Sequence, residues 1–280
     1  MKKISRRSFL AAAGLTVAAL ALTACGGSAS TASSAAASSV AASSEAASTS
    51  AAAAELTTVE AGKLTMATNA AFPPYEMTTD AGAFEGIDIE TAQAIADKLG
   101  LELQIDDMDF DAALLSVQQG KADIVMAGVT VTDERKNVMD FSDSYATGIQ
   151  SIIVPEGSDI ASPDDLAGKK IGTQRGTTGY IYCSDDFGDD AVVAYDNGLT
   201  AVQALNNGQV DAVVIDNAPA KEFVAANPGL VILDTSYAEE DYAIGMAKGS
   251  SLEDAVNAAL EELKADGTLQ SIVDKYITAE

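Results

Sequence analysis

The sequence predicts an α/β protein built from two similar lobes, and three observations lead to this prediction. From residue 63 onward, short apolar runs alternate with helical patterns of apolar and polar residues. A helix end, a glycine, an aspartate and an apolar run follow one another twice, in Ser116–Val125 and in Ala204–Val213, about 88 residues apart. The roughly 225 residues after Leu56 are enough for two small hydrophobic cores.

Each predicted lobe contains strands joined by helices. In the first half we expect strands at Lys63–Thr68, Leu101–Ile105 and Ala122–Ala127, and helices at Asp88–Leu99, ended by Gly100, and Phe110–Gln119, ended by Gly120. In the second half we expect strands at Lys170–Thr173, Ala191–Ala194 and Ala212–Ile215, and a helix at Thr200–Asn207. This order favours parallel-rich sheets with covering helices, whose ligands lie beyond the carboxyl ends of the strands.

The N-terminus is predicted to be an export signal. Met1–Arg7 is basic, and the apolar run Phe9–Leu22 has the length of a signal sequence and is too short to span a membrane. Leu22-Thr-Ala-Cys25 resembles the lipobox of bacterial lipoproteins, in which the cysteine becomes the lipidated first residue. The pair Arg6-Arg7 leaves the Sec and twin-arginine routes open.

We therefore expect residues 1–24 to be a signal peptide and residues 25–55 a lipidated Cys25 followed by a flexible tether. The tether is almost entirely Ser, Ala, Thr and Gly, a composition that buries too little apolar surface to fold. A helix driven by its alanines is the alternative, which the interspersed Ser and Thr disfavour.

The composition excludes several function classes. The chain has no histidine, which removes Ser/His/Asp and Cys/His catalysis and disfavours zinc. Its formal net charge is −26, and such a body repels nucleic acid. The acidic run Asp185–Asp190 lacks the spacing of a calcium loop, so we expect no metal and no cofactor. With Cys25 lipidated, Cys183 has no internal disulfide partner, and we expect it to be small and partly buried.

Candidate binding residues follow the strands of the first half. Asn69 follows the first strand, and Phe72-Pro-Pro-Tyr75 holds two aromatic rings rigidly beside the crevice between the lobes, although both rings also fit a plain core. After the third strand come Gly128, Thr130 and Arg135. An arginine there suits the two-point recognition of a carboxylate; the alternative is an exposed ion pair with a neighbouring acid such as Glu134 or Asp140.

The second half supplies complementary groups. Gly176-Thr177-Thr178-Gly179 joins a strand to a helix N-terminus, where free N–H groups favour an anion. Asp216 follows an apolar strand directly, so it needs a cationic partner or caps the helix expected at Asn217–Ala226. One cation, one anion, an anion-binding helix start and aromatic walls are together the complement of a zwitterion.

The sequence resembles a known family over about Lys63–Tyr276. It is similar to the polar amino acid-binding proteins of ABC importers, family 3 of the bacterial solute-binding proteins, of the glutamine- and histidine-binding kind. The matching motifs are Phe72-Pro-Pro-Tyr75-Glu76, Gly86-Ile-Asp88-Ile, Phe110-Asp111, Gly120-Lys-Ala-Asp123, Gly128-Val-Thr130-Val-Thr-Asp-Glu-Arg135-Lys136, Asp140-Phe-Ser142, Leu166-Ala-Gly168-Lys169, Gly176-Thr177-Thr178, Asp216 and Ala265-Asp-Gly-Thr268.

The resemblance implies a fold and a domain division. The fold is the two-lobed periplasmic binding protein type II fold, each lobe a mixed sheet flanked by helices, joined by two hinge strands near Ile149–Val154 and Tyr242–Met246. The first lobe would comprise residues 56–149 and 242–280, with the C-terminal helices returning to it, and the second lobe residues 150–241.

The resemblance also implies roles and partners. Arg135 would bind the ligand carboxylate with Thr130 and the Thr177–Thr178 amides. Asp216 and the Gly128 carbonyl would bind the ammonium group, and Phe72 and Phe110 would sandwich the side chain. The partners would be a free amino acid, ABC permease subunits and the membrane through the lipid anchor. The protein would be a monomer on the extracytoplasmic face, with no catalytic residue and no nucleic acid ligand.

Departures from the family pattern bear on the ligand. Binders of cationic amino acids often carry an acid where this chain has Asn69, and glutamine binders carry a lysine at Gln174 and a histidine at Ile215. Without these charges we expect a neutral side chain, with Gln, Asn, Ser, Thr, Cys, cystine and small apolar amino acids all open; Arg175 leaves room for an acidic one. The alternatives are an enzyme on the same fold, such as a dehydratase, and a ligand-sensing protein.

Overall fold

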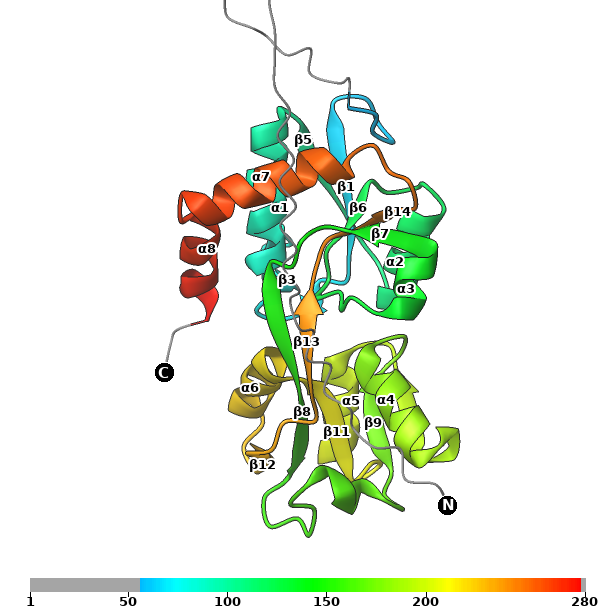
Figure 1. Cartoon of the computed structure of the whole chain (residues 1–280). Helices are drawn as coiled ribbons and strands as arrows, with labels where there is room; N and C mark the ends of the chain where they lie inside the picture. The colour runs from blue at the N-terminus through cyan, green and yellow to red at the C-terminus, as the bar shows by residue number, and fades with distance from the viewer. Residues whose placement is uncertain (1–55, 278–280) are drawn as a thin grey trace, which may run out of the picture. The chain divides into compact units, whose positions relative to one another are not determined.

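The computed structural model describes residues 56–277, and they form two main sheets with helices packed around them (Figure 1). We call the elements of and around the first sheet the first lobe, and those of the second sheet the second lobe. The predicted signal peptide and Cys25, with the tether up to residue 55, lie outside the described residues.

The first sheet has five strands, in the order β5 (Glu102–Asp107), β1 (Lys63–Thr68), β6 (Ile124–Val125), β14 (Gly245–Ala247) and β7 (Met139–Phe141). β1 is parallel to β5 and β6, whereas β14 is antiparallel to β6 and β7. A small antiparallel sheet of β2 (Ala71–Phe72), β3 (Glu76–Thr78) and β4 (Phe84–Glu85) follows β1 in the chain.

The second sheet repeats the parallel core of the first. Its order is β10 (Val192–Tyr195), β9 (Ile171–Gln174), β11 (Ala212–Asp216), β8 (Ala146–Pro155) and β12 (Leu230–Ile232), and β13 (Ala238–Tyr242) pairs with β8. β9, β10 and β11 are parallel, and β8 is antiparallel to its neighbours β11, β12 and β13. Both sheets are therefore mixed, because an antiparallel strand closes each parallel core.

The helices of the first lobe are α1 (Ile87–Leu99), α2 (Phe110–Gln118), α3 (Asp133–Val138), α7 (Glu253–Ala265) and α8 (Thr268–Tyr276). The second lobe has α4 (Thr178–Phe187), α5 (Gly198–Asn206) and α6 (Asn217–Ala226), with short 3₁₀ turns at Pro163–Leu166 and Asp189–Ala191. None of the helices in this part of the chain is long and apolar enough to cross a membrane.

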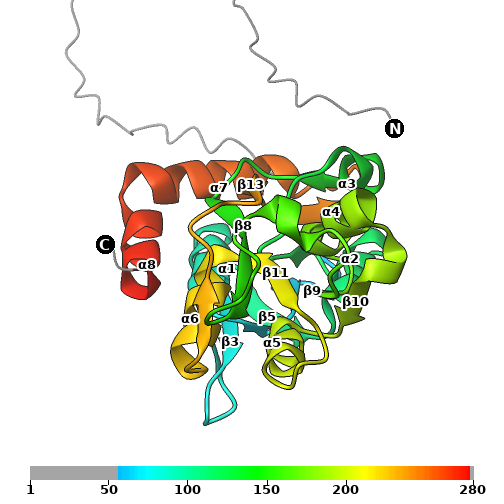
Figure 2. The ribbon, with the colours of Figure 1, turned by 90° about the horizontal axis from the view of Figure 1, so that it is seen from below.

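The C-terminal helices return to the first lobe, as expected. α7 and α8 pack against α1 (Figures 1 and 2). The Lys98 ammonium donates to Glu262 at 3.0 Å, and the Tyr276 hydroxyl donates to Glu90 at 2.5 Å. The C-terminal helices therefore belong to the same lobe as α1.

Most predicted elements occur, with bounds shifted by one or two residues. The strand at Lys63–Thr68 has the predicted bounds, and Gly100 ends α1 in the left-handed conformation. The strand predicted at Ala122–Ala127 was too long, because only Ile124–Val125 is paired as a strand. Asp123, just before it, instead forms a corner by accepting the backbone N–H groups of Val59 and Thr65.

Two segments connect the sheets, between β7 and β8 and between β13 and β14. β8 and β13 run side by side towards the first sheet (Figure 1). The hinge predicted near Ile149–Val154 was misplaced, since these residues pair within the second sheet and the chain leaves the first sheet after Phe141. The lobe boundaries predicted at residues 149/150 and 241/242 stay predictions.

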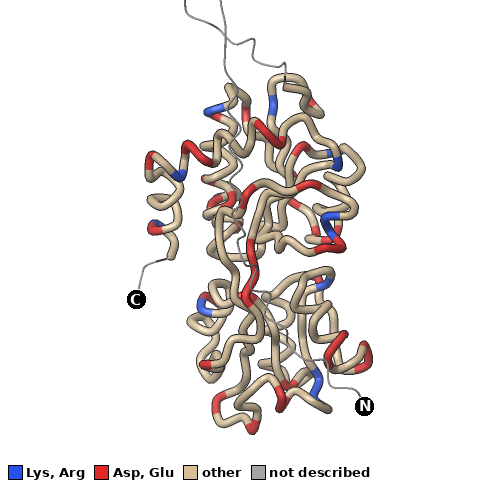
Figure 3. The backbone as a smooth tube through the Cα atoms, in the orientation of Figure 1, with Lys and Arg blue, Asp and Glu red and all other residues tan. Residues whose placement is uncertain are grey.

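Charge and the free cysteine complete the description. Acidic positions recur along the whole tube and outnumber basic ones (Figure 3). Cys183 is completely buried rather than partly buried, and burial raises the pKa of its thiol to about 12, so we expect it to be unreactive.

Candidate ligand-binding site

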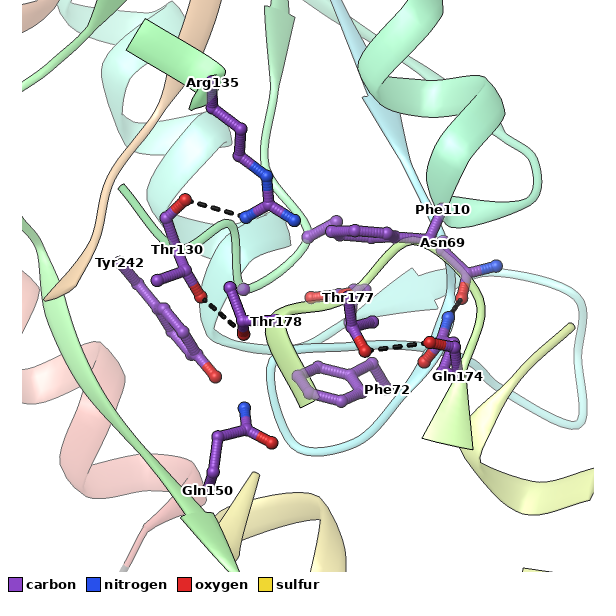
Figure 4. Close-up of a pocket in the computed structure, with 13 residues that line it drawn as sticks. Asn69, Phe72, Phe110, Thr130, Arg135, Gln150, Gln174, Thr177, Thr178 and Tyr242 are labelled. Carbon is purple, nitrogen blue, oxygen red and sulfur yellow. Dashed lines mark hydrogen bonds between the residues drawn. The ribbon is translucent and has the colours of Figure 1, made fainter. Parts of the chain in front are cut away.

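A pocket of about 320 Å³ lies between the two lobes (Figure 4). This volume counts all the empty space between the lining side chains, including space open to solvent. Its lining comes from both lobes and consists of Asn69, Phe72, Glu76, Phe110, Ala127, Gly128, Thr130, Arg135, Gln150, Gln174, Thr177, Thr178 and Tyr242.

The structure brings together nine of the eleven predicted ligand residues: Asn69, Phe72, Phe110, Gly128, Thr130, Arg135, Gln174, Thr177 and Thr178. The other two, Tyr75 and Asp216, do not belong to the lining. Sequence reasoning missed Glu76, Ala127, Gln150 and Tyr242 as pocket residues.

Arg135 is the buried cation of the pocket. Thr132 caps α3 by accepting the Arg135 N–H. The cap fixes Arg135 in the first turn of the helix, and its side chain lines the pocket. One guanidinium nitrogen donates to the Thr130 carbonyl at 2.7 Å and the other to the Gly176 carbonyl at 3.0 Å. Three of its five N–H donors therefore remain for a ligand.

The guanidinium also lies over an aromatic wall, 5.5 Å from the centre of the Phe110 ring. Burial lowers the pKa of Arg135, and the nearby Glu240 carboxylate opposes that shift. The alternative, an exposed ion pair, does not describe Arg135, because Asp140 instead pairs with Lys248 at 2.6 Å.

The start of α4 faces Arg135 across the pocket. Gly176 has a φ of 75°, which glycine adopts readily, and Thr177 caps the helix by accepting the Tyr180 N–H. The helix supplies no acceptor for the first-turn N–H groups of Thr178 and Gly179. Arg135 and this helix start could together hold an anion.

Phe72 and Phe110 are the aromatic side chains of the pocket that we expected, but Tyr75 is core. Its ring stacks on Phe72 with centroids 5.8 Å apart and meets Tyr242 edge-on at 5.4 Å. Because Tyr75 is only 2% exposed and packs behind Phe72, it supports the wall without forming it.

Two amides connect the lobes at the other end of the pocket. Gln174 of the second lobe donates to the side-chain oxygen of Asn69 at 2.9 Å. Asn69 in turn donates to the Met108 carbonyl at 2.9 Å. This end of the pocket therefore carries hydrogen-bonding groups without a formal charge.

Asp216 caps a helix, the second of the two roles considered for it. Its carboxylate oxygens accept the Ala218 N–H at 2.9 Å and the Ile149 N–H at 2.8 Å. Burial raises the pKa of Asp216 to about 6, and these hydrogen bonds limit the rise. Direct contact of Asp216 with a ligand stays a prediction.

A pair of buried acids supports Gly128. Asp88 accepts the Gly128 N–H at 3.0 Å and the Tyr145 hydroxyl at 2.8 Å. Burial raises the pKa of Asp88 to about 6 and the pKa of its neighbour Glu76 well above the usual range. The Gly128 N–H is thus engaged, which leaves its carbonyl for a ligand. Glu76 directly follows Tyr75 in the aromatic motif, and that adjacency was the signal for it.

The residues missed on β8 and β13 form one polar cluster. Glu240 accepts from the Thr130 hydroxyl and from the Gln150 amide, both at 3.0 Å and both at the same oxygen. Thr130 comes from the first lobe, whereas Gln150 and Glu240 come from the second. Gln150 interrupts the apolar run of β8, and that polar residue in a buried strand was the available signal.

Comparison with known proteins gives consistent matches along the folded part of the chain. A family model described as bacterial extracellular solute-binding proteins, family 3, matches residues 64–279. The L-cystine-binding protein TcyJ of Escherichia coli (strain K12) is 33% identical over 226 residues, covering 79% of this chain and 85% of TcyJ. The arginine-binding extracellular protein ArtP of Bacillus subtilis (strain 168) is 33% identical over 228 residues, covering 78% and 87% of the two chains.

Solved structures agree with these matches. The arginine-, lysine-, histidine-binding protein ArtJ from Geobacillus stearothermophilus has a TM-score of 0.75 and 34% identity, covering 78% of this chain and 96% of its own. An ancestral arginine-binding protein bound to glutamine has a TM-score of 0.74 and 42% identity, covering 78% and 99%. The fold is the periplasmic binding protein type II fold that the sequence predicted, and the chain belongs to family 3 of the bacterial extracellular solute-binding proteins.

Proposed function

We propose that this protein is the extracytoplasmic substrate-binding lipoprotein of an amino acid ABC importer. The observation that carries the proposal is the buried Arg135 guanidinium, opposite the N-terminus of α4 in a pocket between two lobes. A buried cation with free donors needs an anion. A carboxylate of a free amino acid fits, because its two oxygens match the guanidinium and the helix N–H groups at once.

The ammonium end of the ligand would lie near the Gly128 carbonyl, with the charge of Asp216 in the wall behind it. The side chain would lie between Phe72 and Phe110 and end near Asn69 and Gln174. Those two amides carry no charge, so a neutral polar side chain complements them best. The similar proteins are named for binding cystine or arginine, and one was solved with glutamine bound. Side chains of different charge are therefore bound within this family.

The proposal also covers the N-terminal segment and the delivery of the solute. Residues 1–24 would be removed as a signal peptide, Cys25 would carry lipid, and residues 25–55 would tether the lobes outside the cell membrane. The loaded monomer would deliver its solute to the permease subunits. Replacing Cys25 with Ser should move the protein from the membrane fraction to the soluble fraction, and an unchanged distribution would contradict the lipid anchor.

We propose binding without catalysis. An enzyme on this fold would need an acid of shifted pKa that touches its substrate. Asp216 has a raised pKa but lies outside the pocket lining, and Glu76 has a raised pKa and belongs to the lining. Binding is favoured because the similar proteins are named as binding proteins and the pocket groups complement a zwitterion.

A thermal-shift screen tests the proposal. Residues 56–280 are unfolded and refolded to remove bound solute, then heated with each of the twenty L-amino acids and cystine. A ligand at 100 times its Kd stabilises by about 2.7 kcal/mol, which for this size raises Tm by roughly 5–10 °C. We expect that rise with one or a few L-amino acids, neutral ones first. A flat response from folded protein would contradict an amino acid ligand.

A further inference from the structure

Glu76 and Asp88 form a buried pair of acids that the proposed function does not use. Both side chains are 0% exposed, and Glu76 belongs to the pocket lining. Glu76 is the first residue of β3, and Asp88 lies in the first turn of α1. The two carboxyl groups are close enough for each to act on the pKa of the other.

The backbone brings the two acids together, because β3 packs against α1. The Asp88 N–H donates to the carbonyl of Tyr75, the residue before Glu76, at 2.8 Å. Gly86 makes this approach possible, since a Cβ atom there would stand 2.2 Å from the same carbonyl oxygen. Its φ of 132° is also one that glycine adopts more readily than other residues. The contact between the acids is therefore fixed by the way β3 meets α1.

The two acids have unequal hydrogen-bond partners. One oxygen of Asp88 accepts the Gly128 N–H at 3.0 Å and the Tyr145 hydroxyl at 2.8 Å. Within residues 56–277, the other Asp88 oxygen and both oxygens of Glu76 are buried without a hydrogen-bond partner. Two ionised carboxylates cannot serve each other, because each only accepts. Two adjacent buried charges would also repel, which keeps a proton on one of them.

A single proton on Glu76 removes most of this shortage. A protonated carboxyl has one O–H donor, which can bond to the unpartnered oxygen of Asp88. The ionised Asp88 then accepts from Gly128, Tyr145 and Glu76. The opposite placement is less favourable, because a charge on Glu76 would lack the two donors that already stabilise Asp88. The proton therefore belongs on Glu76.

The other charges near the pair favour the same arrangement. The titratable groups around it are Tyr75, Tyr145, Asp107 and, lining the same pocket, Tyr242 and Arg135. Asp107 at the end of β5 raises the pKa of Glu76, and burial raises the pKa of the three tyrosines, which stay neutral. The Arg135 guanidinium donates to the carbonyls of Thr130 and Gly176. A negative neighbour and neutral tyrosines both leave the proton on Glu76.

We propose that Glu76 and Asp88 bind a single proton in the wall of the pocket at neutral pH, with neutral Glu76 donating to ionised Asp88. This inference goes beyond the proposed function, since it does not depend on which solute is bound. It makes the wall sensitive to pH. With the proton, a hydrogen bond joins β3 to α1; without it, two buried negative charges repel across the same contact. Glu76 pairs with Phe72 between β3 and β2, so the contact borders the aromatic side of the pocket.

Carbon-13 NMR locates the proton. The full-length chain is purified in detergent with the side-chain carboxyl carbons of glutamate labelled, and a second sample carries the label in aspartate. Spectra are recorded from pH 4 to 9. We expect one glutamate to remain protonated at pH 7, while exposed glutamates ionise near their usual pKa of about 4.3. That signal should be missing in Glu76→Gln and present in the matched control Glu85→Gln, which changes an exposed glutamate on the neighbouring strand β4.

Urea unfolding of the same proteins from pH 5 to 8 measures the effect on the fold. The folded-state pKa of Glu76 lies above its unfolded value, so its contribution to stability is complete below the unfolded pKa and is lost as pH rises towards the folded one. Glu76→Gln places a permanent NH₂ donor beside Asp88 and has no proton to lose. We therefore expect the unfolding equilibrium constant of the wild type to rise about tenfold per pH unit relative to that of Glu76→Gln. Glu85→Gln should follow the wild type.

Other outcomes overturn the proposal. If every glutamate carboxyl of the wild type is ionised by pH 6, Glu76 holds no proton at neutral pH. A protonated aspartate at pH 7 in place of the glutamate would put the proton on Asp88. A constant stability difference between the wild type and Glu76→Gln from pH 5 to 8 would remove the link between the proton and the fold. The NMR measurement on the wild type decides the question even where a variant does not fold, and no outcome depends on whether an amino acid binds.

Discussion

Two buried carboxylates lie on the strands that flank β8, and their hydrogen-bond partners differ. Asp216 on β11 accepts two backbone N–H groups, both from the second lobe. Glu240 on β13 accepts from two side chains, Gln150 of the second lobe and Thr130 of the first. Asp216 is thus held by the construction of its own lobe, whereas the surroundings of Glu240 depend on how the two lobes meet.

This difference indicates which acid responds to the contact between the lobes. An acid satisfied by its own backbone keeps its geometry whether or not the lobes touch. An acid satisfied by side chains across the crevice changes when they separate. Opening would remove Thr130 from Glu240, and with it one of the contacts that shape the pocket. We therefore expect changes at Asp216 to lower stability through its own lobe, and changes around Glu240 to lower stability through the contact between the lobes.

The largest expected effect is at Arg135, the buried cation on which the Glu240 carboxylate acts. Arg135→Lys should weaken ligand binding by about 2–5 kcal/mol, because an ammonium cannot bond two backbone carbonyls and a carboxylate in one plane. Titration calorimetry with the amino acid found by the thermal screen measures the loss.

Lys136→Arg, on the exposed side of the same helix, is the control for Arg135→Lys and should bind as the wild type does. Retained affinity in Arg135→Lys would mean that the ligand carboxylate is held by the start of α4 alone. The ligand would then not be held between Arg135 and the acid Asp216 as we propose.

Much of the fold was predictable because it repeats. Asp123 and Asp211 stand at the same place in the two repeated segments, and each accepts the N–H of a residue in or next to a neighbouring strand, Thr65 and Lys170, at 2.7 Å. Local signals of this kind, with glycine helix ends and aromatic motifs, also placed nine pocket residues.

The missed residues depend on long-range pairing. Gln150 meets Glu240 only because β13 pairs with β8 across about 90 residues of chain. Tyr242 reaches the pocket over Gly148, where a Cβ atom would stand 2.3 Å from its ring. No local sequence pattern predicts these two contacts, because both depend on the pairing of β8 with β13. Tyr75 shows the converse, since an aromatic beside the crevice proved to be core once Phe72 lay in front of it.

The next largest effect is the pH dependence of stability that Asp216 contributes. Because burial raises the pKa of Asp216 from its ordinary 3.8 to about 6, the folded state binds this proton more tightly than the unfolded state. The contribution is complete below about pH 4 and is lost as pH rises through 6, so stability from this group falls with rising pH, by an amount on the order of 2–3 kcal/mol.

Urea unfolding of the wild type and of Asp216→Asn at pH 4, 5, 6 and 7 measures this contribution. The difference in unfolding free energy between the two proteins should change in this window. Asp88 has a similar raised pKa and is present in both, so its effect cancels. A difference that is constant from pH 4 to 7 would mean that Asp216 is ionised throughout, and that it is better solvated than its burial indicates.

The smallest expected effect is at the contact between the lobes. Thr130→Val keeps the shape of the side chain and removes the hydroxyl that donates to Glu240, which leaves that carboxylate with Gln150 as its donor. We expect a loss of about 1 kcal/mol in the free energy of unfolding in urea. Thr130→Ser retains the hydroxyl and is the matched control.

The two substitutions at Thr130 separate hydrogen bonding from packing. If Glu240 depends on the hydroxyl across the crevice, Ser should resemble the wild type and Val should not. Equal losses in Val and Ser would assign the effect to the methyl group and its packing. Glu240 would then be held as locally as Asp216, and the contrast between an acid of one lobe and an acid shared by two would no longer hold.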